Sequence, residues 1–428
     1  MAELTTMNIS IDDQIESNCV LLDLTNNEPL VLQLARSFDP IDLIILPIIA
    51  LIGVPANFCF LFVVWKTPTM RTNLNKYLCT LATVDISVFV VGLGERYLAY
   101  LSPIAIDAHS KTFGSAGCVI QILPEFVYFA SLLMLSLISL ERYYAVCKPL
   151  KHRTFVGGKR TRRQILFVFL ITFIIFSLLI PSRAIPTWYC FLYPQNGKYD
   201  DFPETIVYCG SISELATLIS AICEPMAFYI ALLANLMFST RIIQELCKWD
   251  IPKKSATTGY RNRGVSETDD TDLSTSVTSV SATQTGADDT HTPSTAASPS
   301  TVKTISSGNS HHNYSLTTVS NKEDMLSSNK QKLINKQRSN QRAVTRMLLI
   351  NGLVYFLCNA PLTIFYTVYT ILNKFDIVIY NELLTYAFNA GQCLFYLNSA
   401  LNPFIYGVMN ASYRAAFVNA ILPCRDKK

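Results

Sequence analysis

The sequence predicts an all-α membrane protein: a bundle of seven transmembrane helices followed by a short amphipathic eighth helix. Half of the 428 residues are hydrophobic and only 15% are charged, whereas a soluble protein carries about 25% charged residues. Seven apolar stretches are long enough to cross a bilayer, which needs roughly 20 helical residues. They lack period-two alternation, and only helices or closed barrels satisfy backbone hydrogen bonds in lipid.

The predicted spans divide the chain into parts. The spans cover approximately residues 41–66, 74–101, 115–148, 164–187, 212–246, 342–372 and 380–408. We expect an extracellular acidic N-terminal tail at 1–40, helices one to five at 41–246 and a long cytoplasmic loop at 247–341. Helices six and seven follow at 342–408, and a cytoplasmic eighth helix with a tail at 409–428.

Charges in the links predict the orientation of the bundle. The link at 148–163 carries seven Lys or Arg residues and no acid, and such links lie on the cytoplasmic side. The link at 188–211 instead contains Asp200, Asp201 and Glu204. We therefore expect a multi-pass plasma-membrane protein with an extracellular N-terminus and a cytoplasmic C-terminus.

Three segments outside the spans are candidate modification sites. In the tail, Asn8 opens an N-glycosylation sequon, and no basic stretch followed by an apolar core marks a cleavable signal peptide. Residues 261–320 hold 26 Ser or Thr in 60 positions, a composition that predicts disorder. This loop is either a phosphorylation platform or a spacer. Cys424 follows the amphipathic segment 411–421 and is either palmitoylated or a free thiol.

Polar side chains inside the predicted spans are candidate functional residues, because they are costly in lipid. Asp85 lies midway along the second span, and the seventh contains Asn398, Ser399 and Asn402. These oxygens could form a hydrogen-bonded lock or bind a small hard cation. The third span ends on Glu141 and Arg142.

The sequence offers no sign of an enzyme, of a zinc site or of nucleic-acid binding. The twelve cysteines show no CxxC, CxxH or HExxH spacing, which argues against a zinc site. We find no nucleophile–base pair and no phosphate-binding loop. We therefore expect neither catalysis nor a structural metal.

The motifs in the spans occur in a defined order: LATVD in the second, Cys118 at the start of the third, ERYYAVCKPL at its end, Pro225 in the fifth, CNAP in the sixth and NPFIY in the seventh. In this order they resemble the rhodopsin-like (class A) G-protein-coupled receptors, of the neuropeptide-receptor type.

This resemblance implies roles for residues at matched positions. Glu141 would hold Arg142 at rest, and Arg142 with Leu150 would contact a heterotrimeric G protein. The implied activation switch comprises Glu141, Arg142, Tyr143, Asn359, Pro361, Asn402, Pro403 and Tyr406. The implied site for an allosteric sodium ion, the only cofactor expected, comprises Asp85, Ser131, Asn398, Ser399 and Asn402. Arrestin and receptor kinases are further implied partners.

The chain also departs from the family pattern. Asn359 stands where the sixth span usually has a Trp, Tyr355 stands where a Phe is usual below it, and Leu233 replaces a common Tyr of the fifth span. No Lys lies in the seventh span, which argues against an opsin.

The resemblance further implies a disulfide from Cys118 to the loop between the fourth and fifth spans, on the oxidising side of the membrane. That loop has two candidates, Cys190 and Cys209. We favour Cys209, which would leave Cys190 as a possible partner for Cys19.

The outer face is acidic and predicts a cationic ligand. The long fourth-to-fifth link and the lack of a clear amine-binding Asp favour a peptide, such as a short amidated neuropeptide with an Arg near its C-terminus. Its guanidinium would pair with Glu95 or Glu125; alternatively, Glu125 pairs within the bundle, for example with Arg96. Tyr97, Phe126, Tyr366 and Tyr386 are candidate pocket residues; such aromatics are more often core or lipid-facing.

Two other functions remain open from the sequence. Asp85 could serve a transporter or channel as an ion or proton site, although we find no internal repeat of the kind that many transporters have. A receptor-like scaffold that no longer signals is the other alternative, and Asn359 and Leu233 favour it slightly.

Overall fold

The chain is described here by a computed structural model that covers residues 19–36, 38–155, 157–250, 316–374 and 382–421. The predicted sites at Asn8 and Cys424 and most of the Ser/Thr-rich loop lie outside these residues. The chain divides into two units, 1–251 with 335–428 and 252–334. The described part of the second unit is the beginning of helix α11.

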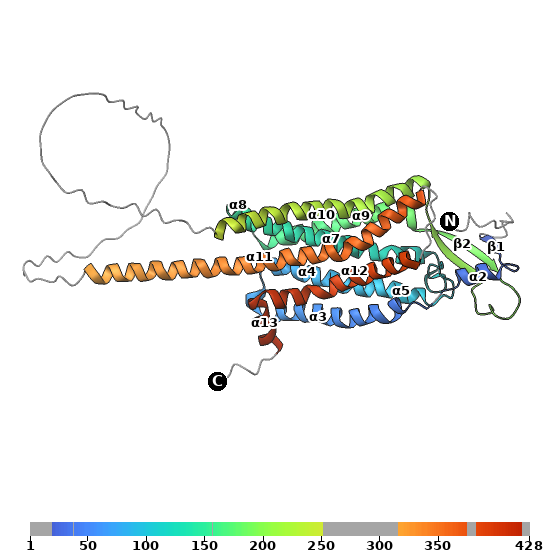
Figure 1. Cartoon of the computed structure of the whole chain (residues 1–428), viewed down its shortest axis with the longest axis horizontal. Helices are drawn as coiled ribbons and strands as arrows, with labels where there is room; N and C mark the ends of the chain where they lie inside the picture. Colours follow the sequence, from blue (N-terminus) through green and yellow to red (C-terminus); the bar gives the residue numbers. More distant parts are fainter. Residues whose placement is uncertain (1–18, 37, 156, 251–315, 375–381, 422–428) are drawn as a thin grey trace, which may run out of the picture. The chain divides into compact units, whose positions relative to one another are not determined.

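Long helices form the first unit, and Figure 1 shows them running side by side. They are α3 (Leu46–Lys66), α4 (Asn73–Ser87), α7 (Gly117–Cys147), α9 (Gly158–Arg183), α10 (Glu214–Asp250), α11 (Leu316–Lys374) and α12 (Glu382–Met409). A π-helical turn, Val88–Leu93, joins α4 to α5 (Gly94–Ala99), and another, Ile41–Ile45, precedes α3. The predicted helical bundle is confirmed.

Six helical segments within the described residues are long and apolar enough to cross a membrane. Helix α12 has a comparable length of 28 residues, but its asparagines and Gln392 lower its mean hydropathy. Large apolar side chains on the bundle are exposed, among them Leu51 (76%), Trp65 (69%) and Leu233 (66%). Such surfaces suit contact with lipid rather than water.

Two large clusters of buried apolar side chains lie inside the bundle. One cluster packs α7, α9, α10 and α11 together through Phe129, Leu179, Phe228 and Tyr355. A second lies toward α13 (Ala411–Ile421), where Phe60 stacks near Tyr406 and Tyr413. Helix α13 corresponds to the predicted amphipathic helix and packs against α3 and α12.

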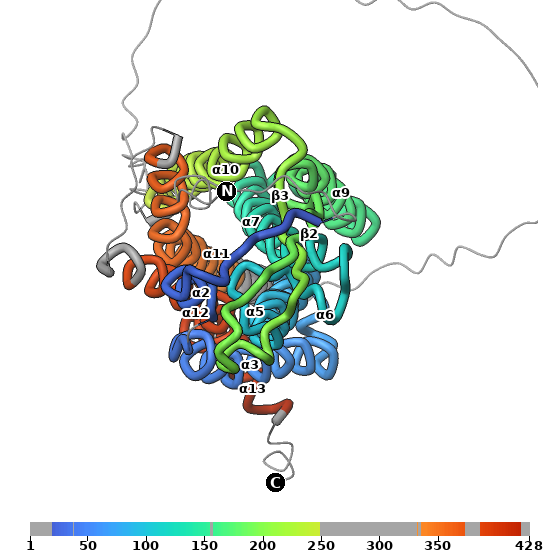
Figure 2. Tube along the Cα trace, turned by 90° about the vertical axis from the view of Figure 1, so that its right-hand side faces the viewer, coloured from blue at the N-terminus to red at the C-terminus, as the bar shows by residue number. Residues whose placement is uncertain are grey.

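A small sheet lies at one end of the bundle, which we call the sheet end (Figures 1 and 2). Strand β1 (Val20–Asp23) pairs in parallel with β2 (Ile185–Leu192), and β2 pairs in antiparallel with β3 (Thr205–Gly210). The sequence prediction was wrong here, because it extended the fourth span to residue 187. The helix ends at Arg183, and β2 begins at Ile185, directly before Pro186.

Two disulfides fix the sheet. Cys118, near the start of α7, bonds Cys209 of β3, the favoured of its two candidates, and Cys19 bonds Cys190 of β2. Helix α2 (Glu28–Leu34) also packs on the sheet, where the Glu28 carboxylate accepts hydrogen bonds from Lys198 Nζ and Tyr199 Oη, each at 3.0 Å. The bond from Lys198, followed by that from Tyr199, lowers the pKa of Glu28.

Candidate functional site

A cavity of about 610 Å³ lies among the helices toward the sheet end. Its lining includes Arg183, the last residue of α9, and Glu214, the first residue of α10, which adjoin the strands in sequence. Of the residues predicted to bind a ligand, Glu95, Glu125 and Tyr366 line this cavity.

Three predicted pocket residues, Tyr97, Phe126 and Tyr386, are not among its lining residues. Tyr97 and Tyr386 are 41% and 67% exposed. Phe126 packs edge-on against Phe176, with ring centroids 5.7 Å apart. Their role in ligand binding stays a prediction, since a helical aromatic outside this cavity serves the core or the outer surface equally well.

The centre of the cavity wall is an ionic triad, Glu125–Arg183–Glu224. The Arg183 Nη2 atom lies 2.5 Å from Glu224 Oε2, whereas Nη1 lies 3.5 Å from Glu125 Oε1. Glu125 therefore does pair within the bundle, but not with Arg96. Arg96 Nη1 instead lies 2.6 Å from Asp42 Oδ1.

The sequence interpretation missed Arg183 because it placed this residue inside an apolar span. A basic side chain five residues before the first predicted loop residue, 188, was the available signal. With Arg183 and Arg96 the lining contains two cations, and it contains four carboxylates, those of Glu95, Glu125, Glu214 and Glu224. The cavity therefore has an excess of negative charge.

Asp85 lies in the middle of the bundle, fully buried. Asn402 Nδ2 donates to its Oδ2 atom at 2.6 Å, while Oδ1 has no hydrogen-bond partner among the described residues. Asn57 ties α3 to α12 by donating to the Ser399 carbonyl at 2.9 Å. The Asn57 and Asn398 side-chain oxygens are buried and, within the described chain, likewise lack partners.

This donor set fits a small hard cation, because it presents unpaired carboxylate and amide oxygens. Ser131 is also buried, on α7, which packs against the Asp85 helix. The Asp85–Asn402 hydrogen bond is compatible with the alternative of a structural lock.

At the far end of the bundle, Glu141 does not hold Arg142 as predicted. Its Oε1 atom lies 2.8 Å from His152 Nε2, on the short helix α8 (Pro149–Phe155). In the part of the chain that the structure describes, no acid lies within ion-pair distance of Arg142. Glu141 therefore pairs with His152 of the neighbouring helix α8, a contact that the sequence analysis did not predict.

The other predicted switch residues lie on facing helices. Tyr406 is 1% exposed and packs against Phe60, while Tyr143 lies under the Lys148 ammonium. Leu150 is 78% exposed on α8. Pro361 and Pro403 lie inside α11 and α12.

Asn359 is a buried residue of α11. It lines the cavity, and its Nδ2 donates to the Tyr355 carbonyl at 2.7 Å, one turn earlier in α11. Its side-chain oxygen is buried without a partner among the described residues. The Asn359 side-chain amide therefore forms a hydrogen bond within its own helix.

A helical membrane bundle with a charged cavity at one end, and the adjacent residues Glu141 and Arg142 near the end of α7 at the other, has the architecture of a heptahelical receptor. The family model for 7 transmembrane receptors of the rhodopsin family matches residues 56–406, and the chain belongs to this family of G-protein-coupled receptors.

Similar proteins include neuropeptide receptors. Neuromedin-U receptor 2 of Rattus norvegicus is 23% identical over 382 residues, which cover 88% of this chain and 74% of that protein. The human neuromedin-U receptor 2 (Homo sapiens) is 24% identical over 393 residues, covering 90% and 72%. The thyrotropin-releasing hormone receptor of Ovis aries is 25% identical over 400 residues, covering 92% and 80%.

Replacing Arg183 should destabilise the protein. Arg183→Gln leaves Glu125 and Glu224 facing each other without a cation. Breaking a buried pair costs about 3–5 kcal/mol, but Arg183 is 40% exposed, so we expect about 1–2 kcal/mol. Thermal unfolding of purified protein in detergent measures the loss as a lower melting temperature.

The exposed pair Lys198–Glu28 supplies the matched control. Lys198→Gln should leave the melting temperature almost unchanged, because an exposed ion pair contributes little to stability. Adding Glu224→Gln to Arg183→Gln should restore part of the lost stability, since it removes one of the two repelling charges. Equal melting temperatures for Arg183→Gln and the original protein would contradict the triad.

Proposed function

We propose that this receptor binds a short cationic peptide from the extracellular side and activates a heterotrimeric G protein at its cytoplasmic end. The observation that supports it best is the surplus of carboxylates in a cavity walled by several helices. The names of its relatives, receptors for neuromedin U and thyrotropin-releasing hormone, support a peptide.

The proposed orientation places the sheet end outside the cell in the plasma membrane. The disulfides lie at this end, and disulfides persist in oxidising compartments. The link at 148–163 with its seven basic residues then lies on the cytoplasmic side, in agreement with the positive-inside rule.

Within the cavity, Glu125 is the more available of the triad's two carboxylates. Arg183 holds Glu224 at 2.5 Å but approaches Glu125 only to 3.5 Å. A ligand guanidinium could therefore bind Glu125 through a charge-assisted hydrogen bond without displacing Arg183 from Glu224. Glu95 supplies a second carboxylate on the same wall.

The proposed response to the ligand is a shift between two arrangements of the helices. A peptide that binds one arrangement better will populate it, and opening of the cytoplasmic helix ends would expose Arg142 and the already exposed Leu150 to the G protein. Arrestin and receptor kinases are proposed further partners; the Ser/Thr-rich loop would be their substrate region.

The proposed allosteric ion is sodium, held by Asp85 with Ser131, Asn398, Ser399 and Asn402. When bound, it would supply positive charge to a buried carboxylate. The chain's own contribution is the Asn402 amide, which holds one carboxylate oxygen and leaves the other free.

A library of short amidated peptides, half of them with an Arg near the C-terminus, tests the proposed function. Cells that express the receptor are assayed for calcium, cyclic AMP and arrestin recruitment. We expect responses from Arg-containing members. Silence in every channel, with surface expression verified by antibody, would count against peptide signalling.

Arg142→Ala should abolish G-protein activation while leaving peptide affinity within about threefold, because the side chain lies far along α7 from the cavity-lining Glu125 and its proposed contact is the G protein. Nucleotide exchange on purified G protein and peptide binding to the same membranes measure the two effects. Loss of binding without loss of exchange would overturn the assigned role.

Asp85→Asn should remove any stabilisation by sodium. An ion that binds only the folded state raises the melting temperature with its concentration. We expect a higher melting temperature in NaCl than in N-methyl-glucamine chloride for the original protein and for Thr83→Ala, an exposed change on the same helix, but not for Asp85→Asn. Equal melting temperatures in both salts would contradict the ion site.

A further inference from the structure

His109 has an unusual place in the fold, immediately before the short helix α6 (Ser110–Phe113). Its backbone is left-handed, with φ 59° and ψ 34°, and it is the one non-glycine residue with positive φ among those described. Few non-glycine residues adopt this conformation, although asparagine, aspartate and histidine do so more often than the others. Strained backbone of this kind suggests a functional constraint.

The imidazole of His109 is also buried at a cost. Only 3% of the residue is exposed, and neither ring nitrogen has a hydrogen-bond partner in the described part of the chain. A buried polar group without a partner is unfavourable. The fold therefore maintains both a strained backbone and an unsatisfied ring at this position.

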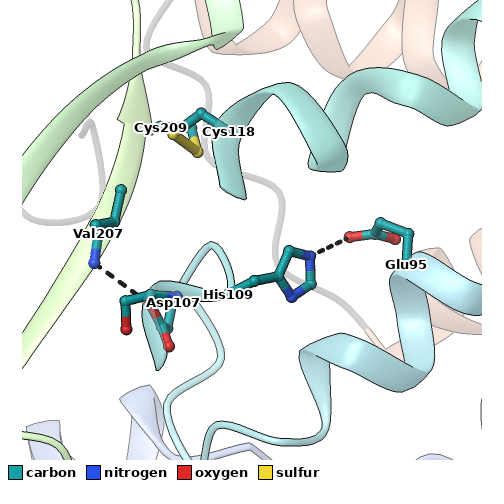
Figure 3. Close-up of a disulfide and its surroundings, with 7 residues drawn as sticks. Glu95, Asp107, His109, Cys118, Val207 and Cys209 are labelled. Carbon is teal, nitrogen blue, oxygen red and sulfur yellow. Dashed lines mark hydrogen bonds and ion pairs between the residues drawn. A yellow bond between two sulfur atoms is a disulfide. The ribbon is translucent and has the colours of Figure 1, made fainter. Parts of the chain in front are cut away.

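The imidazole faces the cavity carboxylate Glu95. His109 Nε2 lies 3.5 Å from Glu95 Oε1, and Figure 3 shows the ring directed at this carboxylate. Glu95 in turn lines the cavity. The contact thus joins the link between α5 and α7 to the proposed ligand site.

Two guanidinium groups also act on Glu95 electrostatically, those of Arg36 and Arg96. Arg96 is paired with Asp42 at 2.6 Å. Arg36 directs its nitrogens to the carbonyls of the α5–α7 link, those of Ser102, Ile104 and Ala105. Across the described residues, His109 is consequently the only basic side chain within ion-pair distance of Glu95.

The sheet fixes the position of His109. The Ala108 amide donates to the Val207 carbonyl at 2.8 Å, and the Val207 amide donates to Asp107 Oδ1 at 3.3 Å. Val207 belongs to β3, two residues before Cys209 of the disulfide to α7 (Figure 3). Asp107 Oδ1 also accepts from the Ser110 amide at 3.2 Å.

We propose that His109 is a positioning residue for ligand recognition: its imidazole, fixed by the sheet through Asp107 and Ala108, holds Glu95 at the cavity wall. With Oε1 turned to the imidazole, Oε2 is left for the cationic group of the ligand. This inference rests on the proposed function, because it concerns a carboxylate assigned there to a cationic peptide.

Two substitutions of His109 test the contact between its imidazole and Glu95. His109→Gly tolerates the left-handed conformation and removes the side chain. His109→Gln carries a side-chain amide N–H at about the reach of the imidazole Nε2 and so retains a donor for Glu95. Lys111→Gln, an exposed change on α6, is the matched control. The full-length receptor is purified in lipid nanodiscs, and its folding is verified by a single cooperative melting transition.

The probe is L-argininamide, which combines a guanidinium with a terminal amide. Its Kd is obtained from the rise in melting temperature with probe concentration. We expect His109→Gly and Glu95→Gln each to raise the Kd roughly fivefold, the effect of losing one partly exposed charge contact. The double variant should lose no more than either single variant, and His109→Gln should restore the Kd to within about twofold.

The outcomes distinguish this inference from the proposed function. If L-argininamide binds the original receptor and His109→Gly equally well, or if the two losses add in the double variant, His109 does not position Glu95. If His109→Gln is as impaired as His109→Gly in spite of normal folding, the N–H contact is not the cause. If L-argininamide does not bind the original receptor, the proposal of a cationic ligand is overturned, and with it the role of His109 in recognising that ligand.

Discussion

An ionised side chain inside a bilayer needs a partner, and this requirement organises the whole bundle. Asp42 pairs with Arg96, and Glu141 pairs with His152. Arg183 pairs with Glu224 and Glu125. Each pair joins different helices, so the charges also set which helices approach one another. Among the buried side-chain atoms that lack a hydrogen-bond partner in the described residues are an oxygen of Asp85 and the Arg142 Nε atom, two groups to which the family resemblance assigns an ion and a moving contact.

The sequence predicts the helices well and their polar contacts poorly, for a physical reason. An apolar run must become a helix in lipid whatever surrounds it, so the bundle follows from local composition. The partners of Glu125 and Glu141 lie on other elements, at the end of α9 and on α8. Such contacts depend on packing between segments far apart in sequence. The sheet was missed because a strand needs a partner strand. Val20 of β1 pairs with Tyr189 of β2, far along the sequence and beside the Cys19–Cys190 disulfide.

The departures from the family pattern fall into two kinds. Leu233 is 66% exposed, so this position contacts the surroundings of the bundle and not the cavity. Asn359 is buried, and it bonds the carbonyl of Tyr355 within its own helix. The residue lines the cavity, and its side-chain oxygen has no hydrogen-bond partner among the described residues. A small polar group thus replaces the bulky ring expected between the cavity and the lower core.

Strand β1 also has a consequence for the order in which the chain assembles during synthesis. It is made before any membrane helix, yet β2, its neighbour in the sheet, emerges only after four helices have been made. The acidic N-terminal segment must therefore remain available, with Cys19 reduced or paired elsewhere, until β2 arrives. Closing this sheet is a late event of biosynthesis, and an oxidising folding environment must still be present at that time.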